Sequence, residues 1–99
     1  MNVFIRIHVK KSEDLLLFMM NLKILAFGIA KEIIGQLELP VQLADAATVA
    51  DLKQLLTSQF PDFQKLASLR VAVNTEYADD NAVLFPNDEI VLIPPVSGG

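Results

Sequence analysis

Short stretches in which apolar and polar residues alternate run along much of this chain, and such alternation is typical of β-strands. It predicts strands over residues 2–9, 36–43 and 69–74. Residues 21–27 and 89–93 are apolar on both faces, which is expected of strands in the middle of a sheet, so we place these two side by side. Pro40 has no amide hydrogen for a ladder, which indicates an edge position for the strand at 36–43.

One segment has helical spacing instead. From residue 49 to residue 60, apolar residues recur every three or four positions, at Val49, Leu52, Leu55, Leu56 and Phe60. Thr48 is the expected N-cap, with Asp51 three residues later, and Pro61 ends the helix. A shorter helical turn over residues 29–34 is expected to end at Gly35.

The segments between these elements carry weaker signals. Residues 61–68 are interpreted as a connection and 75–78 as a turn with a short return strand. Tyr77 is expected to pack in that hairpin. A loop follows from residue 79, in which Asp79 and Asp80 are expected to be solvated and Leu84 and Phe85 to be buried anchors. Asn87 suits a turn that needs a left-handed residue.

From Met20 onward the order is two strands, a helix across the sheet, and further strands. This order predicts an α+β domain with the ubiquitin-like β-grasp fold, a mixed sheet with one main helix on one face. We divide the chain into an N-terminal extension (1–19), the β-grasp domain (20–93) and an extended C-terminal tail (94–99). The extension is interpreted either as an extra strand, added at a sheet edge or exchanged between protomers, or as sequence upstream of a start at Met19 or Met20.

Composition narrows the function classes. The 99 residues are 53% hydrophobic and 20% charged, with a formal net charge of −4, which argues for a folded domain and against nucleic acid or an anionic membrane as partner. There is no Cys and one His, His8, so neither thiolate catalysis nor a metal site is expected. Asn21 and Lys23 interrupt the longest apolar stretch, so we expect no membrane span, no export signal and a cytoplasmic location.

The C-terminal end carries the most specific chemistry. Pro94 and Pro95 fix φ and lack amide hydrogens, so the chain is expected to leave the last strand stiff and extended. Gly98 and Gly99 have no Cβ, so the last residues can pass through a narrow channel in another protein. The reactive group is then the Gly99 carboxylate. The alternative is an ordinary frayed terminus.

Four stretches make Met20–Gly99 resemble the small subunits of molybdopterin synthase, which are ubiquitin-like sulfur carriers. They are Lys23–Phe27 with Lys31–Gly35, Thr48–Leu52, Ala72–Tyr77, and Asp88–Ile90 with Pro94-Pro95-Val96-Ser97-Gly98-Gly99. The family's Arg is replaced by Lys31, and the Gly before its Asp is replaced by Asn87.

The resemblance implies that a ubiquitin-activating-like enzyme adenylates Gly99 with ATP and that a persulfide donor then converts it to a thiocarboxylate. The large subunit of molybdopterin synthase would use that sulfur to build the dithiolene on a cyclic pterin phosphate precursor. ATP, the catalytic bases and the pterin would all be bound by partners, and this chain would bind no cofactor. The alternatives are a sulfur carrier for the thiamine thiazole ring, another ubiquitin-like protein modifier, and an inert β-grasp interaction module.

The strand faces also suggest a partner surface. The side of the sheet away from the helix should carry Leu25, Phe27, Ala72, Val91 and Ile93, and an open apolar face is typical of an interface. Lys31 joins this surface through the resemblance. In the alternative interpretation, the segment around Phe63 and Leu66, or the N-terminal strand, covers that face.

Overall fold

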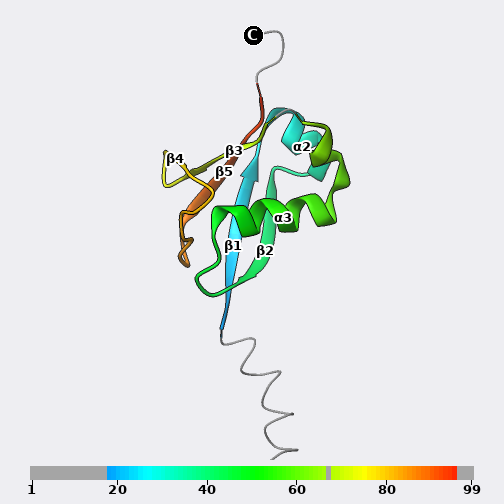
Figure 1. Cartoon of the computed structure of the whole chain (residues 1–99). Coiled ribbons are helices and arrows are strands. Elements are labelled where there is room, and N and C mark those ends of the chain that lie inside the picture. Colours follow the sequence, from blue (N-terminus) through cyan, green and yellow to red (C-terminus); the bar gives the residue numbers. More distant parts are fainter. Residues whose placement is uncertain (1–17, 67, 96–99) are drawn as a thin grey trace, which may run out of the picture.

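Five strands and two α-helices form the protein in the computed structural model, which describes residues 18–66 and 68–95 (Figure 1). In chain order they are β1 (Met19–Ala26), α2 (Gly28–Ile34), β2 (Glu38–Ala44), α3 (Val49–Gln59), the 3-10 helix η1 (Pro61–Lys65), β3 (Arg70–Val73), β4 (Glu76–Ala78) and β5 (Glu89–Ile93). The strand predicted over residues 2–9 lies outside the described residues.

The sheet is mixed, with strand order β2-β1-β5-β3-β4. The last strand lies in the middle, parallel to β1 and antiparallel to β3, as its apolar sequence predicts. The hairpin partner β2 is an edge strand, where the missing amide hydrogen of Pro40 breaks no ladder on the outer side. This arrangement is the predicted α+β β-grasp fold.

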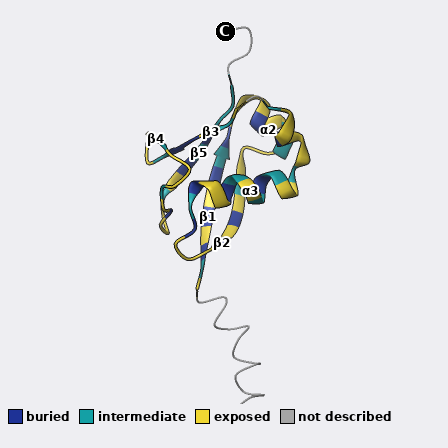
Figure 2. Cartoon of the chain, in the orientation of Figure 1, coloured by how far each residue is buried: buried dark blue, intermediate teal, exposed yellow. Residues whose placement is uncertain are grey.

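Helix α3 covers one face of the sheet, and the core lies between them (Figure 2). Its apolar side supplies Val49, Leu52 and Leu56, each fully buried. The inward residues of the central strands face it, and all of them are at most 4% exposed: Leu22, Ile24, Val71, Ile90 and Leu92. Burial of such side chains contributes roughly 1.5–3 kcal/mol each, so this layer is the main source of stability.

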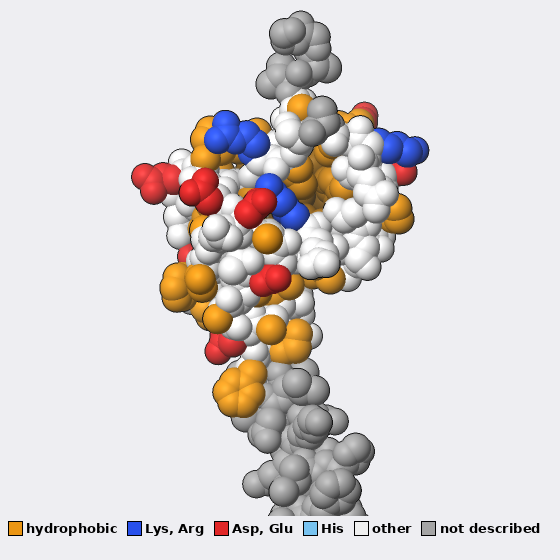
Figure 3. Space-filling model, in the orientation of Figure 1, with side chains coloured by type: hydrophobic (Ala, Val, Ile, Leu, Met, Phe, Trp, Pro, Cys, Tyr) orange, Lys and Arg blue, Asp and Glu red, His pale blue; other side chains and the backbone are white. Residues whose placement is uncertain are grey.

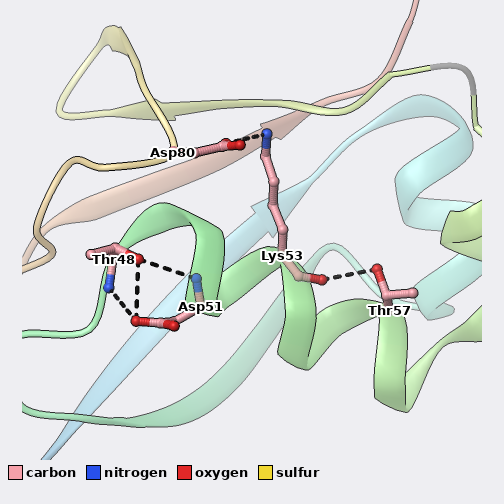
Figure 4. Close-up of polar contacts among 5 residues, drawn as sticks. All are labelled: Thr48, Asp51, Lys53, Thr57 and Asp80. Atoms are coloured by element: carbon pink, nitrogen blue, oxygen red, sulfur yellow. Dashed lines mark hydrogen bonds and ion pairs between the residues drawn. The ribbon is translucent and has the colours of Figure 1, made fainter.

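The N-terminus of α3 is fixed by side chains and by the loop after β4 (Figure 4). Thr48 and Asp51 form a reciprocal capping box: the Thr48 amide donates to Asp51 Oδ2 at 2.9 Å, and the Asp51 amide donates to Thr48 Oγ1 at 3.3 Å. The amides of Val49 and Ala50 donate to the carbonyls of Ala82 and Asp80, each at 3.0 Å. The first turn therefore has partners for the amides that a helix leaves free.

Three local predictions need correction. Phe27 lies one residue beyond β1, as the N-cap of α2, because the chain turns into that helix at Gly28. The connection after α3 contains η1, whose Phe63 is buried in the core in edge-to-face contact with Phe60. Leu84 is a buried anchor, but Phe85 is 61% exposed, because adjacent residues of this extended loop point to opposite sides.

Candidate functional site

The root of the C-terminal tail lies at one end of the central strands. Because β5 is parallel to β1, both strands end at the same edge of the sheet, and the chain leaves the domain there (Figure 1). Pro94 and Pro95, the first residues after β5, are half-buried. Val96, Ser97, Gly98 and Gly99 lie outside the described residues, so the roles assigned to them remain predictions.

The face of the sheet away from α3, here called the open face, carries a short apolar row. Leu25 of β1 is opposite Val91 of β5, and Val91 is opposite Ala72 of β3. Leu25, Val91 and Ile93 are half-buried, as expected of side chains on a face that no helix of residues 18–66 and 68–95 covers. The segment around Phe63 and Leu66 packs on the core side instead and does not cover this face.

Phe27 extends this row toward the tail. Its backbone is extended, with φ −127° and ψ 164°, so the alternation of β1 continues and places it on the side of Leu25. It is 49% exposed, which makes it a large apolar group open to a partner. Lys31 is an exposed residue of α2, one turn further along the chain.

Two further residues lie on the open face: Arg70, which the sequence analysis did not single out, and Tyr77, which was expected only to pack in the hairpin. Arg70 stacks on Tyr77, with its guanidinium carbon 3.8 Å from the ring centroid, and both residues are exposed. Tyr77 is opposite Ala72 and Arg70 is opposite Ile93, so the pair borders the apolar row. Flanking by these larger side chains explains why the small Ala72 is only 8% exposed, although we expected it to be open. Arg and Tyr are enriched where interfaces have their strongest contacts.

The other border of the row is charged. Lys23 of β1 is 3.8 Å from Glu38 of β2 and is opposite Glu89 of β5, and all three are exposed. The open face is therefore an apolar centre between an ion pair on one side and a cation–aromatic pair on the other. This division into an apolar core and a polar rim is typical of protein interfaces.

Two of the stretches that carry the family resemblance, residues 72–77 and 88–90, are joined by side-chain hydrogen bonds. Asn74 Nδ2 donates to Asp88 Oδ1 and Asn74 Oδ1 accepts from the Glu89 amide, both at 2.9 Å. Asp88 Oδ2 also accepts from the Phe85 amide at 2.8 Å. These bonds join the turn after β3 to the start of β5 and thus fix the strand that leads into the tail.

A second group of exposed apolar side chains lies at the end of the domain where β1 begins (Figure 3). Phe18 is 63% exposed, Phe85 61% and Val83 43%. The hydrogen bond of Phe18 with Asp45 and the bridge between Val83 and Thr48 bring two of them to the same end. That end is opposite the tail root, so this group is no part of the open face.

Polar features elsewhere are structural as well. Asp80 pairs with Lys53 of α3 at 2.7 Å, so it links the loop to the helix (Figure 4). Over residues 18–66 and 68–95, no three metal-ligating side chains come together, and no helix combines the length and apolar character that a membrane crossing requires.

Comparison with known proteins agrees with this geometry. The profile of the ThiS family matches residues 24–99. The molybdopterin synthase sulfur carrier subunit of Arabidopsis thaliana is 34% identical over 80 residues, covering 80% of this chain and 83% of that protein. The solved structure of SAMP1 from Haloferax volcanii has a TM-score of 0.69 and 26% identity, over 80% of this chain and 99% of the other.

A further structure is that of the complex of subunits 1 and 2 of the molybdopterin-converting factor from Helicobacter pylori. It aligns with a TM-score of 0.56 and 26% identity, over 81% of this chain and 100% of that one. Fold, tail root and family match together define a ubiquitin-like β-grasp protein of the sulfur-carrier class. Within that class the chain belongs to the ThiS family and, more narrowly, to the molybdopterin synthase sulfur carrier subunits.

Proposed function

We propose that this chain is the sulfur carrier subunit of molybdopterin synthase and that it holds the sulfur as a thiocarboxylate on Gly99. The supporting observation is a Pro-Pro-Val-Ser-Gly-Gly end that directly follows the central strand β5, in a chain without Cys. Without a thiol, the chain has no other group that is suited to receive sulfur and to release it again. The family match includes this end.

The chemistry follows from the low reactivity of a carboxylate. An oxygen of Gly99 attacks the α-phosphorus of ATP, pyrophosphate leaves, and the acyl adenylate forms. A persulfide sulfur then attacks the acyl carbon and AMP leaves. A thiol cleaves the resulting acyl disulfide, is oxidised to a disulfide, and releases the thiocarboxylate. Partners provide the ATP site and the sulfur donor, and the reaction would take place in the cytoplasm, where ATP is available.

The partner that uses the sulfur would be the large subunit of molybdopterin synthase. The Helicobacter pylori protein of the same fold is described in complex with its second subunit, which supports this assignment. We propose that the open face binds it through Leu25, Val91 and Ile93, with Phe27 and Lys31 beside the tail. The tail would then insert into the partner, where the thiocarboxylate sulfur would displace an oxygen from a side-chain carbon of the cyclic pterin phosphate. Water would then hydrolyse the acyl–sulfur bond, which leaves the sulfur on the pterin and returns Gly99 to a carboxylate. Two such transfers would build the dithiolene.

Intact-mass spectrometry tests the carrier chemistry. With ATP, a sulfur donor and the activating enzyme, the protein should gain the mass of one oxygen-to-sulfur exchange, located on Gly99. Deletion of Gly99 and Gly98→Leu should both abolish the gain, the first by removing the acceptor and the second by blocking the channel. Sulfur found elsewhere, or a Gly99 deletion that still accepts sulfur, would contradict the proposal. If Gly99 becomes a thiocarboxylate but the pterin precursor and the large subunit do not consume that thiocarboxylate, the carrier donates sulfur to a different product.

A matched pair of aromatic residues tests the partner surface. Phe27→Asp should weaken binding to the large subunit by at least ~2 kcal/mol, or about 30-fold, because an apolar anchor is lost. Phe85→Asp makes the same change at a site that is also exposed (61% against 49% for Phe27), at the other end of the domain, and should leave affinity unchanged. Equal affinities of both variants and the natural chain, measured by calorimetry, would exclude the open face as the binding surface.

A further inference from the structure

Gly28 and Pro94 are neighbours in space at the point where the chain leaves the sheet. The parallel register of β1 and β5 runs from Lys23 opposite Glu89 to Ala26 opposite Leu92. Extended by two residues, it sets Gly28 beside Pro94. A Cβ built on Gly28 would lie 3.8 Å from Pro94 Cγ, so the two residues are neighbours and the space between them would hold about one methyl group. Pro94 is half-buried, although among the described residues no strand pairing continues past Ile93.

The backbone at Gly28 explains why a glycine stands there. Its φ of +56° is the left-handed conformation that turns the extended chain at Phe27 into α2. A side chain at this position would be strained, its Cβ would be in van der Waals contact with the Pro94 ring, and further atoms on that side would push the ring away. Gly35 is also left-handed, with φ +90°, but within the described part of the chain nothing lies within 4 Å of its Cβ position. A side chain would therefore be strained at either glycine, but only at Gly28 would it meet a neighbouring residue.

We infer that Gly28 is a positioning residue for the C-terminal tail. Because Gly28 has no side chain, the Pro94 ring can keep its place beside it, and the fixed φ of Pro94 and Pro95 then restricts the direction of the residues that follow. The inference rests on the proposed function in one respect: a preset direction lowers the entropic cost of inserting the tail into a partner. The effect belongs to binding, so it should alter KM more than kcat.

The first experiment uses the isolated full-length protein and needs no partner. Since the chain has no Cys, Ser97→Cys offers a unique site for a nitroxide, whose broadening of backbone amide signals reports where the tail lies. In that background, Gly28→Val should redistribute the broadening over the domain, whereas Gly35→Val should leave it unchanged. Pro94→Ala removes the ring without straining the fold and should reproduce the Gly28→Val pattern. Unchanged broadening in Pro94→Ala would overturn the inference.

The second experiment measures thiolation by the activating enzyme without the label. Gly28→Val and Pro94→Ala should each raise KM about tenfold, with kcat within about twofold, and Gly35→Val should do neither. A moved tail with unchanged KM would refute the positioning role. A natural chain that accepts no sulfur would refute the proposed function but leave the result of the broadening experiment valid, so the two failures are distinguishable.

Discussion

The Asn74 side chain provides a test of how the turn motifs hold the fold together. It makes two hydrogen bonds, to the Asp88 carboxylate and from the Glu89 amide, and its backbone has φ +52°. Each hydrogen bond contributes about 1 kcal/mol in net terms, so their loss costs roughly 2 kcal/mol. An alanine held in the left-handed backbone conformation adds about 1 kcal/mol of strain. Asn74→Ala should therefore lower the free energy of unfolding by about 3 kcal/mol.

Two further variants separate the contributions. Asn74→Gly removes the hydrogen bonds but tolerates the positive φ, so it should cost about 2 kcal/mol. Asn87→Ala places alanine at φ +74°, at a position for which no side-chain hydrogen bond occurs among the described residues, and should cost about 1 kcal/mol. In a domain of this size, 3 kcal/mol lowers the melting temperature by roughly 15 °C.

The assay is urea unfolding followed by far-UV circular dichroism, since the chain has no Trp to report on its packing. Equal m-values across the variants are needed for comparison of the free energies. If Asn74→Gly is as stable as the natural chain, the hydrogen bonds do not hold β5 to the turn. If Asn74→Ala and Asn87→Ala lose the same amount, backbone strain alone accounts for the motif.

Two smaller changes test the attachment of α3. Thr48→Ala removes one partner of the capping box and should cost about 1 kcal/mol in chemical denaturation, whereas Thr57→Ala, on the same helix, should cost less than half of that; equal losses would contradict the capping role. Lys53→Met breaks the 2.7 Å ion pair with Asp80, whose side chain is exposed. It should lower the free energy of unfolding by about 0.5 kcal/mol at low salt and by less at 1 M salt. A loss that salt does not reduce would show that the apolar stem of the lysine, and not its charge, is responsible.

Features set by neighbouring residues could be predicted from the sequence. The capping box of α3, the left-handed Gly35 and Asn87, and the apolar side of the helix each depend on a few consecutive residues. The central position of β5 could be predicted too, because a strand that is apolar on both faces is typical of the middle of a sheet. The hairpin at residues 72–77 was predicted as well, but not the hydrogen bonds by which Asn74 joins it to Asp88 and Glu89.

Features that depend on register could not be predicted. The Arg70–Tyr77 stack and the burial of Ala72 need the pairing of β3 with β4 residue by residue. The proximity of Gly28 to Pro94 could be found only from the parallel register of two strands that are far apart in the chain. Alternation tells which residues share a face but not which of them are opposite one another, and the open face is built from opposite residues.

Because the two faces alternate, neighbouring residues of β5 should separate stability from partner binding. Leu92 is fully buried, and Leu92→Asp would place a charge in the core, so we expect the domain to unfold. Ile93→Asp places the same charge on the open face opposite Arg70, where the guanidinium can pair with it, so the fold should survive. Its affinity for the large subunit should nevertheless fall at least about 30-fold. Circular dichroism distinguishes folded from unfolded variants, and calorimetry then measures binding of the folded one. A folded Ile93→Asp that binds with natural affinity would show that Ile93 is no part of the surface that binds the large subunit.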